Sequence, residues 1–435
     1  MNKNKNKMKR QMNKYLWMIV CVGISLTAVY AQRSYMLDEC LEQALAHNLR
    51  LKTAERNLQM AQEDRKNAFT KYFPSVSATG GGVLANKGLL EMELQPGALM
   101  SLADDGLMGG VTATLPLFAG GQIVNSNKLA EVQVEVNKLQ LRQSEEEVRL
   151  TTTQYFWQTV MLKEKLHTLY IIEEQLTNLQ RDVEASVEAG VTNRNDLLQV
   201  QLKQNETQSQ RIQVMNALAL MRNLLAQYMG LGVDSVEVSF QLEDQMPHTP
   251  ASLYTTPESA LPQTNEYHLL QQQVKASQLQ KKIAVGKNLP SVAIGGGYAY
   301  ENLMGRDHDF WVGFVTVSVP LTAWWGGSHD IKKHKIVVRN AEDQLKDQSE
   351  MLIIQMRKSW NDLTDAYKQV DISRKSIEQS TENLRLQNEY YTAGTCTMSD
   401  LLEAQTLYQQ SRDQYVESYA QYEVKKREYL QATGR

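Results

Sequence analysis

The residue types that usually carry enzyme chemistry do not form a recognisable site in this sequence. Seven histidines are scattered over 435 residues, and none belongs to an HExxH motif. The glycine clusters at 81–82, 120–121 and 295–297 lack the Lys-Ser/Thr of a phosphate-binding loop and the full dinucleotide fingerprint. No nucleophile elbow occurs. These observations predict no metal, no cofactor and no enzymatic activity.

Two carboxylates occupy equivalent positions in a motif that occurs twice. Ala189-Gly190 is followed by Asp196-Leu197-Leu198, and Ala393-Gly394 is followed by Asp400-Leu401-Leu402. Glycine adopts the left-handed backbone that ends many helices. A carboxylate in the first turn of the next helix meets the positive end of the helix dipole. Each motif therefore predicts a tight turn between two helices.

The two motifs belong to a long internal duplication. Leu115-Pro116-Leu117 returns as Val319-Pro320-Leu321, and the distance from Pro116 to Gly190 equals that from Pro320 to Gly394 (190 − 116 = 394 − 320 = 74). Phe73-Pro74-Ser75-Val76 likewise returns at Leu289–Val292. The period is far too long for a solenoid. We predict a first repeat at 32–233, a connecting segment at 234–256 and a second repeat at 257–435.

The first 31 residues have the organisation of a secretory signal peptide. Six Lys/Arg precede an apolar run at Tyr15–Tyr30, and Val29 and Ala31 precede a cut before Gln32. The run is short for a spanning helix, which needs about 20 residues, and the residues before Cys21 do not match a lipid-attachment box. Removing six positive charges lowers the formal net charge from −3 to −9. An acidic mature chain is a poor candidate for binding nucleic acid.

Four short segments have the two-residue alternation of β-strands. Ser291–Tyr300 and Phe310–Val319 each have an apolar face, whereas Ser75–Gly80 and Val111–Leu115 alternate more weakly. A half-buried sheet in a soluble protein would give the same alternation. Aromatic residues near strand ends are typical of membrane strands at the lipid surface. The candidate interface aromatics are Tyr298, Tyr300, Trp311, Trp324 and Trp325.

The strand count predicts an oligomer. No mature segment is apolar for 20 residues, so a membrane-spanning region would consist of strands. Four strands cannot close a barrel, because the smallest membrane barrels have about eight, and an open edge cannot lie in lipid. Several copies would therefore share one barrel, with the loops Lys87–Leu107 and Glu301–Asp309 facing outside. The strand count alone does not give the number of copies.

Long helical patterns fill most of the remaining chain. Gln122–Val187 contains neither Pro nor Gly and would be roughly 100 Å long as a helix. Shorter helices are expected at about Leu37–Tyr72 and Pro257–Lys287. Large residues recur along two seams at coiled-coil spacing: Leu162, Leu166, Leu169, Ile172, Leu176, Leu179, Val183 and Val187 in one, and Leu401, Tyr408, Tyr415, Tyr422 and Tyr429 in the other. The helices alone fit a soluble coiled coil, but joined to membrane strands in a duplicated unit they favour a tube wall.

In this order, the duplicated strands, long helices and turns resemble TolC-type outer-membrane efflux proteins over about Tyr35–Thr433. The resemblance implies a mixed membrane α+β fold, in which each protomer of a homotrimer adds four strands to a shared twelve-stranded outer-membrane β-barrel and long coiled-coil helices to a periplasmic tunnel. The implied partners are outer-membrane lipid, a periplasmic adaptor and an inner-membrane transporter. The implied function is a passive exit duct for small toxic molecules or exported polypeptides. The alternative is a barrel-anchored structural or adhesive coiled-coil surface protein.

The resemblance also suggests roles for the two turns, which would be the periplasmic tips of the tunnel. Asp400 matches the position at which the family places a ring of carboxylates at the entrance, and Glu403, one turn on, would add a second ring. Threefold symmetry would bring like charges together, attract cations and raise the pKa of the carboxyl groups. Both residues are therefore candidate pore-lining groups.

One position in the turns departs from the family. Tyr391 and Asp196 match residues that help to hold the entrance closed in well-known members, but Cys396 stands where those members have an arginine. Cysteine cannot form the charge-assisted pair that arginine forms with aspartate. We therefore expect other contacts to close the entrance, and we interpret Cys396 as a small turn residue rather than a redox switch.

Overall fold

The computed structural model describes residues 34–86, 90–95, 98–102, 105–232, 236–240, 246–302, 307–321 and 323–435, with only the backbone given for 90–95, 98–102, 105, 323 and 324. The predicted signal peptide at 1–31 therefore lies outside the described residues. Within these ranges, every helix is too short or too polar to cross a membrane.

The described residues form two compact units. The helical unit comprises the residues up to Ala46, Thr152–Met246 and Ile372–Ala420, and the sheet unit comprises His47–Thr151, Pro247–Asp371 and Gln421–Arg435. Each unit thus draws segments from both predicted repeats, whose boundaries stay a prediction. Two long helices, α4 (Gln122–Glu188) and α8 (Ala323–Thr392), contribute residues to both units.

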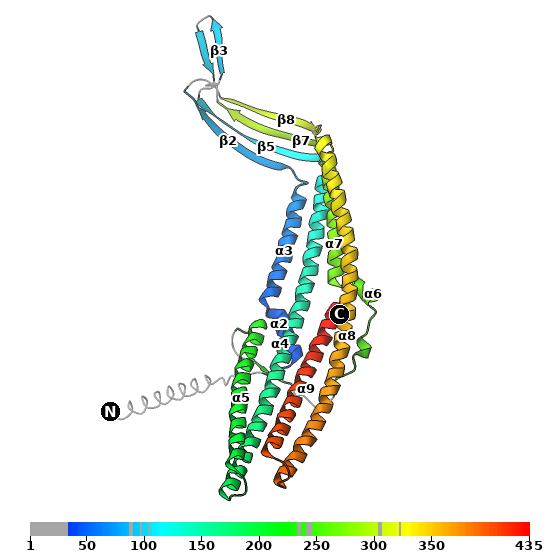
Figure 1. The fold of residues 1–435 in the computed structure, drawn as a ribbon. Helices are drawn as coiled ribbons and strands as arrows, with labels where there is room; N and C mark the ends of the chain where they lie inside the picture. Colours follow the sequence, from blue (N-terminus) through cyan, green and yellow to red (C-terminus); the bar gives the residue numbers. More distant parts are fainter. Residues whose placement is uncertain are drawn as a thin grey trace, which may run out of the picture. The chain divides into compact units, whose positions relative to one another are not determined.

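The sheet unit contains a four-stranded antiparallel sheet (Figure 1). Its strands follow the order β2 (Ser75–Leu84), β5 (Asp105–Ala119), β7 (Ser291–Glu301) and β8 (His308–Ser318). All four predicted strands are therefore confirmed. Since β5 pairs with β7, strands from the two repeats are neighbours in a single sheet.

The register of the sheet gathers apolar side chains on one face. Tyr298 pairs with Trp311 and with Val111, and Ile294 pairs with Val315 and with Leu115. Successive residues of a strand point to opposite faces, so these partners share a face. Trp311 is 81% exposed and Val315 is 69% exposed, and this face is therefore uncovered in a single chain.

Glycines on the opposite face of the sheet permit close packing. A Cβ at Gly295 would lie 2.4 Å from the ring of Phe314, and a Cβ at Gly297 would lie 2.8 Å from the carbonyl oxygen of Val111. Any larger residue at these positions would clash with its neighbours. These glycines therefore allow the strands and side chains on this face to pack closely.

The region predicted as the loop Lys87–Leu107 is not a simple loop. It contains two short antiparallel strands, β3 (Leu90–Gln95) and β4 (Ala98–Leu102). The turn between them, at 96–97, lies outside the described residues. This hairpin was not predicted, because short strands alternate over too few residues to be distinguished from a loop.

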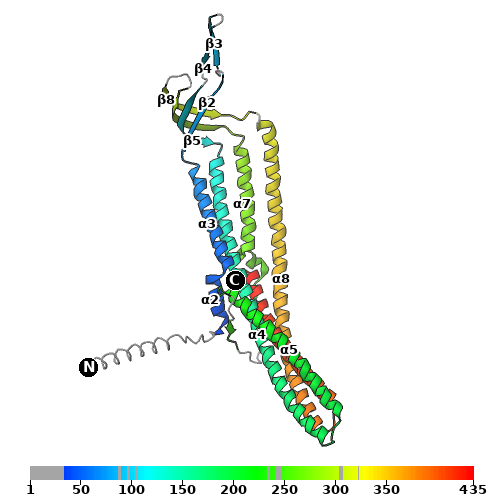
Figure 2. The ribbon, with the colours of Figure 1, turned by 90° about the vertical axis from the view of Figure 1, so that its left-hand side faces the viewer.

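Four helices connect to the strands at the same end of the sheet. α3 (Leu49–Thr70) leads into β2, β5 leads into α4, α7 (Asn265–Gly286) leads into β7, and β8 leads into α8. Within the sheet unit these helices run side by side, as Figures 1 and 2 show from two directions. One end of each helix therefore lies next to the strands.

Both of the shorter predicted helices are interrupted. The predicted helix Leu37–Tyr72 consists of α2 (Leu37–His47) and α3, because Asn48 has extended backbone angles and its side chain accepts a hydrogen bond from the Arg50 amide at 2.9 Å. The predicted helix Pro257–Lys287 begins with the single turn α6 (Pro257–Ala260) and the 3₁₀ turn η2 (Leu261–Gln263) before α7. Thr264 caps α7. Local capping thus overrides a continuous helical pattern at both places.

Tyrosine hydroxyls bind the connecting segment to α9 (Met398–Ala432) within the sheet unit. Tyr422 donates to the carbonyl oxygen of His248 at 2.5 Å, and Tyr429 accepts from the amide of Thr255 at 3.0 Å. Both tyrosines are buried. The end of the predicted tyrosine heptad is therefore a buried seam, and the hydroxyls of Tyr422 and Tyr429 bond backbone groups seven residues apart.

The helical unit packs α5 (Arg194–Tyr228) with the adjacent parts of α4, α8 and α9. Its core near the turns contains Ile172, Leu176 and Val183 of the predicted α4 seam. Farther along, Trp157 packs against Phe240 and Tyr419, with ring centroids 4.7 and 5.6 Å away. A short parallel pair, β1 (Ser34–Tyr35) and β6 (Glu237–Val238), completes the unit.

Candidate functional site

The two predicted turns have the same backbone structure. Gly190 has φ +71° and Gly394 has φ +72°. The next residue in each turn donates to a carbonyl five residues back, from Val191 to Ser186 at 2.8 Å and from Thr395 to Tyr390 at 2.9 Å. This pattern is the Schellman termination of a helix. The predicted left-handed glycines are confirmed in both turns.

The return helices also begin in the same way. The side chains of Asn193 and Thr397 accept hydrogen bonds from the amides of Asp196 and Asp400, both at 3.2 Å. In return, the Asp400 carboxylate accepts a hydrogen bond from the Thr397 amide at 2.9 Å and another from the Thr397 hydroxyl at 2.6 Å. This reciprocal arrangement is a capping box with Asp in place of Glu. Thr397 was not predicted as a capping residue, although a Thr three residues before an Asp is a recognisable capping signal in a sequence.

The capping bonds change the acidity of Asp400. Hydrogen bonds from the Thr397 hydroxyl and amide hold the pKa of Asp400 below its usual value, because they stabilise the charged form. The side chain is exposed. Glu403 is also exposed, one turn further along α9. Within one chain, Asp400 is therefore an ionised, solvent-facing carboxylate.

Tyr391, Asp196 and Cys396, which stand at the positions expected from the resemblance to close the entrance, lie close to one another. Burial raises the pKa of Tyr391, and the nearby charges of Asp196 and Cys396 raise it further. Asp196 also accepts a short hydrogen bond from the Thr192 hydroxyl. Cys396 lies 3.5 Å from the carbonyl oxygen of Gln387, as a sulfur donor would. The structure thus groups Tyr391, Asp196 and Cys396, residues from both turns.

A hydrophobic cluster holds the two turns in place. Val200 from α5 and Met398 from α9 are buried with Ile172, Leu176 and Val183 of α4. Tyr391 and Leu402 pack against this cluster. Because these apolar contacts and the helix caps involve both turns, they fix the positions of the candidate entrance residues within the helical unit.

The predicted interface aromatics lie in the sheet unit. Tyr298 donates to Asp309 at 2.6 Å, and Tyr300 donates to Asp307 at 2.7 Å. Trp311 is on the same face as Tyr298, and Trp325, near the start of α8, is 79% exposed. The side chain of Trp324 lies outside the described residues. The aromatics therefore occur at both ends of the strand pair.

Two aromatic residues on β8 were missed. Phe310 and Phe314 alternate with Trp311, so they lie on the face with the glycines. They were not predicted because only the apolar face of this strand was considered. The same two-residue alternation places both of them on the other face. The face with the glycines therefore also has aromatic side chains.

Metal-ligating side chains do not gather in the described ranges, where no group of three or more His, Cys, Asp or Glu has suitable geometry. Cys40 is buried, and burial raises the pKa of its thiol to about 12. A thiol with so high a pKa is protonated at neutral pH. The chemistry available at the turns is electrostatic, through Asp400 and Glu403.

Comparison with known proteins decides the family. A family model described as outer membrane efflux protein matches residues 40–231 and 258–435. The chain belongs to this family. The match confirms the resemblance to TolC-type proteins that the duplicated motifs suggested. No curated protein matches the sequence.

Solved structures of outer-membrane channels have the same fold as this efflux-family chain. CusC superposes with a TM-score of 0.79 at 14% identity and covers 92% of each chain. CmeC of Campylobacter jejuni gives 0.77 at 14% identity, covering 92% of this chain and 85% of its own. VceC of Vibrio cholerae gives 0.76 at 12% identity, covering 92% and 96%. The family and these structures support an outer-membrane efflux channel, and both consist of channel proteins rather than enzymes.

Proposed function

We propose that this protein is the outer-membrane exit duct of a tripartite export system. Three copies share a twelve-stranded barrel, and their long helices form a periplasmic tunnel. The duct conducts passively, and its partners supply the energy. Its cargo is small toxic molecules or exported polypeptides.

The observation that carries this proposal is the incompleteness of the four-stranded sheet. In the described residues, β2 and β8 each pair on one side only. The face that carries Trp311, Val315 and Val317 is exposed, with Trp311 at 81%. An apolar face beside unpaired strand edges is unstable in water and in lipid, unless the edges pair with other strands. Sharing a barrel among copies satisfies both requirements.

The number of copies and the partners rest on family membership. Three protomers with four strands each would close a twelve-stranded barrel, within the size range of known membrane barrels. The capped turns at Gly190 and Gly394 would form the periplasmic tips, where a periplasmic adaptor and an inner-membrane transporter would dock. Asp400 and Glu403 would line the entrance.

Planar-bilayer recording of the detergent-purified protein tests the proposal. We expect a trimer that conducts ions in discrete steps. The adhesive alternative requires no continuous lumen, so it predicts an assembly without conductance. A non-conducting monomer would refute the duct.

A further inference from the structure

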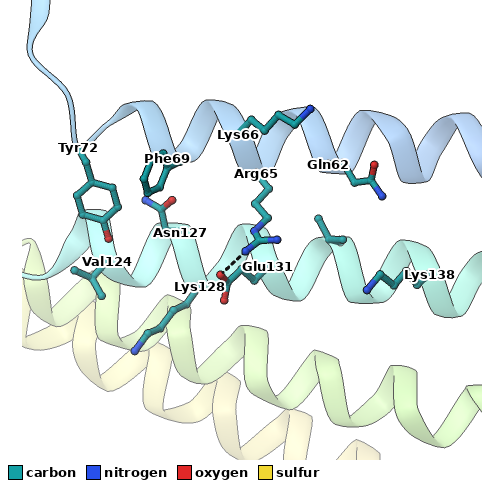
Figure 3. A pocket seen from close by; sticks show the side chains of 11 residues that line it. Gln62, Arg65, Lys66, Phe69, Tyr72, Val124, Asn127, Lys128, Glu131 and Lys138 are labelled. Carbon is teal, nitrogen blue, oxygen red and sulfur yellow. Dashed lines mark hydrogen bonds and ion pairs between the residues drawn. The ribbon is translucent and has the colours of Figure 1, made fainter.

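A groove between α3 and α4 lies next to the sheet and has no assigned role. It encloses about 730 Å³ within the sheet unit. Its walls are the last three turns of α3 and the first five turns of α4, which are the ends that adjoin β2 and β5. Figure 3 shows the side chains that line it.

The groove changes from apolar to cationic along its length. Tyr72, Phe69 and Val124 lie at the end where the chain leaves α3 for the sheet, as Figure 3 shows. Arg65, Lys66 and Lys138 lie farther from the sheet, and the ammonium group of Lys128 lies level with Phe69. If the strands span a membrane, the apolar end faces the acyl chains and the cationic part faces the headgroups. This order matches the order of groups in a phospholipid.

The charges that line the groove are mostly positive. The lining contains four cations, Arg65, Lys66, Lys128 and Lys138, and one acid, Glu131, which binds Arg65 at 3.0 Å. Lys66 and Lys138 also form exposed pairs with Glu63 and Glu135, at 2.7 and 3.3 Å. Such surface pairs contribute little and exchange readily. Lys128 has no ion pair in the described part of the chain.

The neighbouring helix ends are basic as well. Residues 275–286 of α7 contain no acid, and the first 13 residues of α8 contain one, Asp330. Exposed or half-buried lysines lie in these helix ends, next to the strands: Lys281, Lys282, Lys287, Lys332, Lys333 and Lys335. The described residues give none of these six an ion pair. Positive charge is thus concentrated beside the sheet in a chain whose net charge is negative.

We infer that the groove between α3 and α4 binds the phosphate headgroup of an anionic phospholipid in the membrane leaflet that the helices approach. The inference rests on the proposed membrane-spanning role of the strands. The cations of the groove favour an anionic ligand, and its aromatic end favours a ligand that also has acyl chains.

The test compares two double variants of the full-length chain in detergent. Lys66→Gln with Lys128→Gln removes one paired and one unpaired cation of the groove. Lys368→Gln with Lys346→Gln is the matched control, since Lys368 pairs with Asp365 at 3.2 Å and Lys346, exposed farther along α8, has no ion pair among the described residues. Titration with phosphatidylglycerol, phosphatidylcholine or inorganic phosphate, followed by native mass spectrometry, measures binding.

We expect the groove variant to bind phosphatidylglycerol roughly thirtyfold more weakly than the wild type, since each lost cation near a lipid surface accounts for about a fivefold change. The control should bind normally, and added salt should weaken wild-type binding. Equal phosphatidylglycerol affinity in both variants would overturn the inference. So would displacement of the lipid by inorganic phosphate alone, or loss of the oligomer in the groove variant.

Conductance of the same preparations separates this inference from the proposed function. A wild type that conducts but does not prefer phosphatidylglycerol over phosphatidylcholine leaves the duct intact and removes the lipid site. A wild type that does not conduct contradicts the duct itself. The groove variant should conduct as the wild type does, because both lysines lie outside the proposed entrance.

Discussion

At the scale of single residues, two effects act on the Asp400 carboxyl in opposite directions. The capping bonds from Thr397 lower its pKa, whereas a threefold ring of like charges would raise it. Because this pKa is lower in the folded state, the capping bonds stabilise the fold at pH values above the pKa of the unfolded chain. This contribution is lost as the pH falls through the pKa of the folded state. The pH at which selectivity changes therefore reports which effect dominates.

Replacing Asp400 with Asn should reduce the preference of the channel for cations, because the change removes the charge and keeps an oxygen that can cap the helix. Reversal potentials in a salt gradient measure the effect. Asp343→Asn is the control, since Asp343 is an exposed carboxylate of α8 within the sheet unit. Equal selectivity in wild type and Asp400→Asn would exclude the entrance role.

The turn glycines should tolerate no side chain without cost. Gly394→Ala should lower the free energy of unfolding by about 1–2 kcal/mol, which is the cost of a left-handed residue with a Cβ. No atom lies within 4 Å of that Cβ, so no steric clash adds to this cost. Gly326→Ala, in the helix α8 and also without close neighbours, should instead be neutral or stabilising by up to about 1 kcal/mol. Chemical denaturation in detergent compares the two. If Gly326→Ala costs as much as Gly394→Ala, the left-handed conformation is not the cause.

At the scale of elements, the contact between α4 and α9 contains a carboxyl that is destabilising at neutral pH. Burial, reinforced by Glu417 and opposed by Lys165, raises the pKa of Asp413 to about 6 from an ordinary value of 3.8. The folded state therefore binds the proton more tightly, and stability should rise as the pH falls from about 7 towards 4.

Asp413→Asn should therefore stabilise the protein at pH 7 by about 1 kcal/mol, allowing for the partial exposure of the group. The advantage should disappear below about pH 4, where Asp413 is protonated in both states. Thermal unfolding at several pH values measures this difference. An advantage that is independent of pH would show that the charge is not responsible.

The tyrosine seam of α9 should hold the connecting segment through its hydroxyls. Tyr422→Phe leaves the carbonyl oxygen of His248 without this donor and should cost about 1–2 kcal/mol. Tyr408→Phe is the control, because its hydroxyl has no hydrogen bond in the described part of the chain. Limited proteolysis within 246–256 should accelerate in Tyr422→Phe only. Equal cleavage rates in the two variants would contradict the bracing role.

At the scale of the whole molecule, closure of the barrel makes the edge strands β2 and β8 of different copies neighbours. After Cys40 and Cys396 are replaced by Ser, single cysteines at Ser77 or Thr79 of β2 combined with one at Thr316 of β8 should cross-link between chains. Closed threefold symmetry predicts products of two and three chains and nothing larger. Longer ladders in a non-reducing gel would indicate an open assembly.

Much of this protein follows from local patterns in its sequence. The duplication, the four strands, the glycine turns and the coiled-coil seams depend on neighbouring residues and on periodicity, so the order of residues alone predicts them. The interruptions at Asn48 and Pro257–Thr264 were missed because capping competes with a pattern that still looks helical. The β3–β4 hairpin was missed because its strands are short.

Which distant residues come into contact depends on the tertiary structure. Pairing of β5 with β7 joined the two repeats into one sheet, a choice that strand patterns cannot make because any strand offers the same backbone donors and acceptors. The grouping of Tyr391, Asp196 and Cys396, and the bonds from Tyr422 and Tyr429 to the connecting segment, likewise depend on how the helices pack. The sequence determined the elements and their periodicity, because these depend on local chemistry, whereas contacts between elements depend on the folded arrangement of the whole chain.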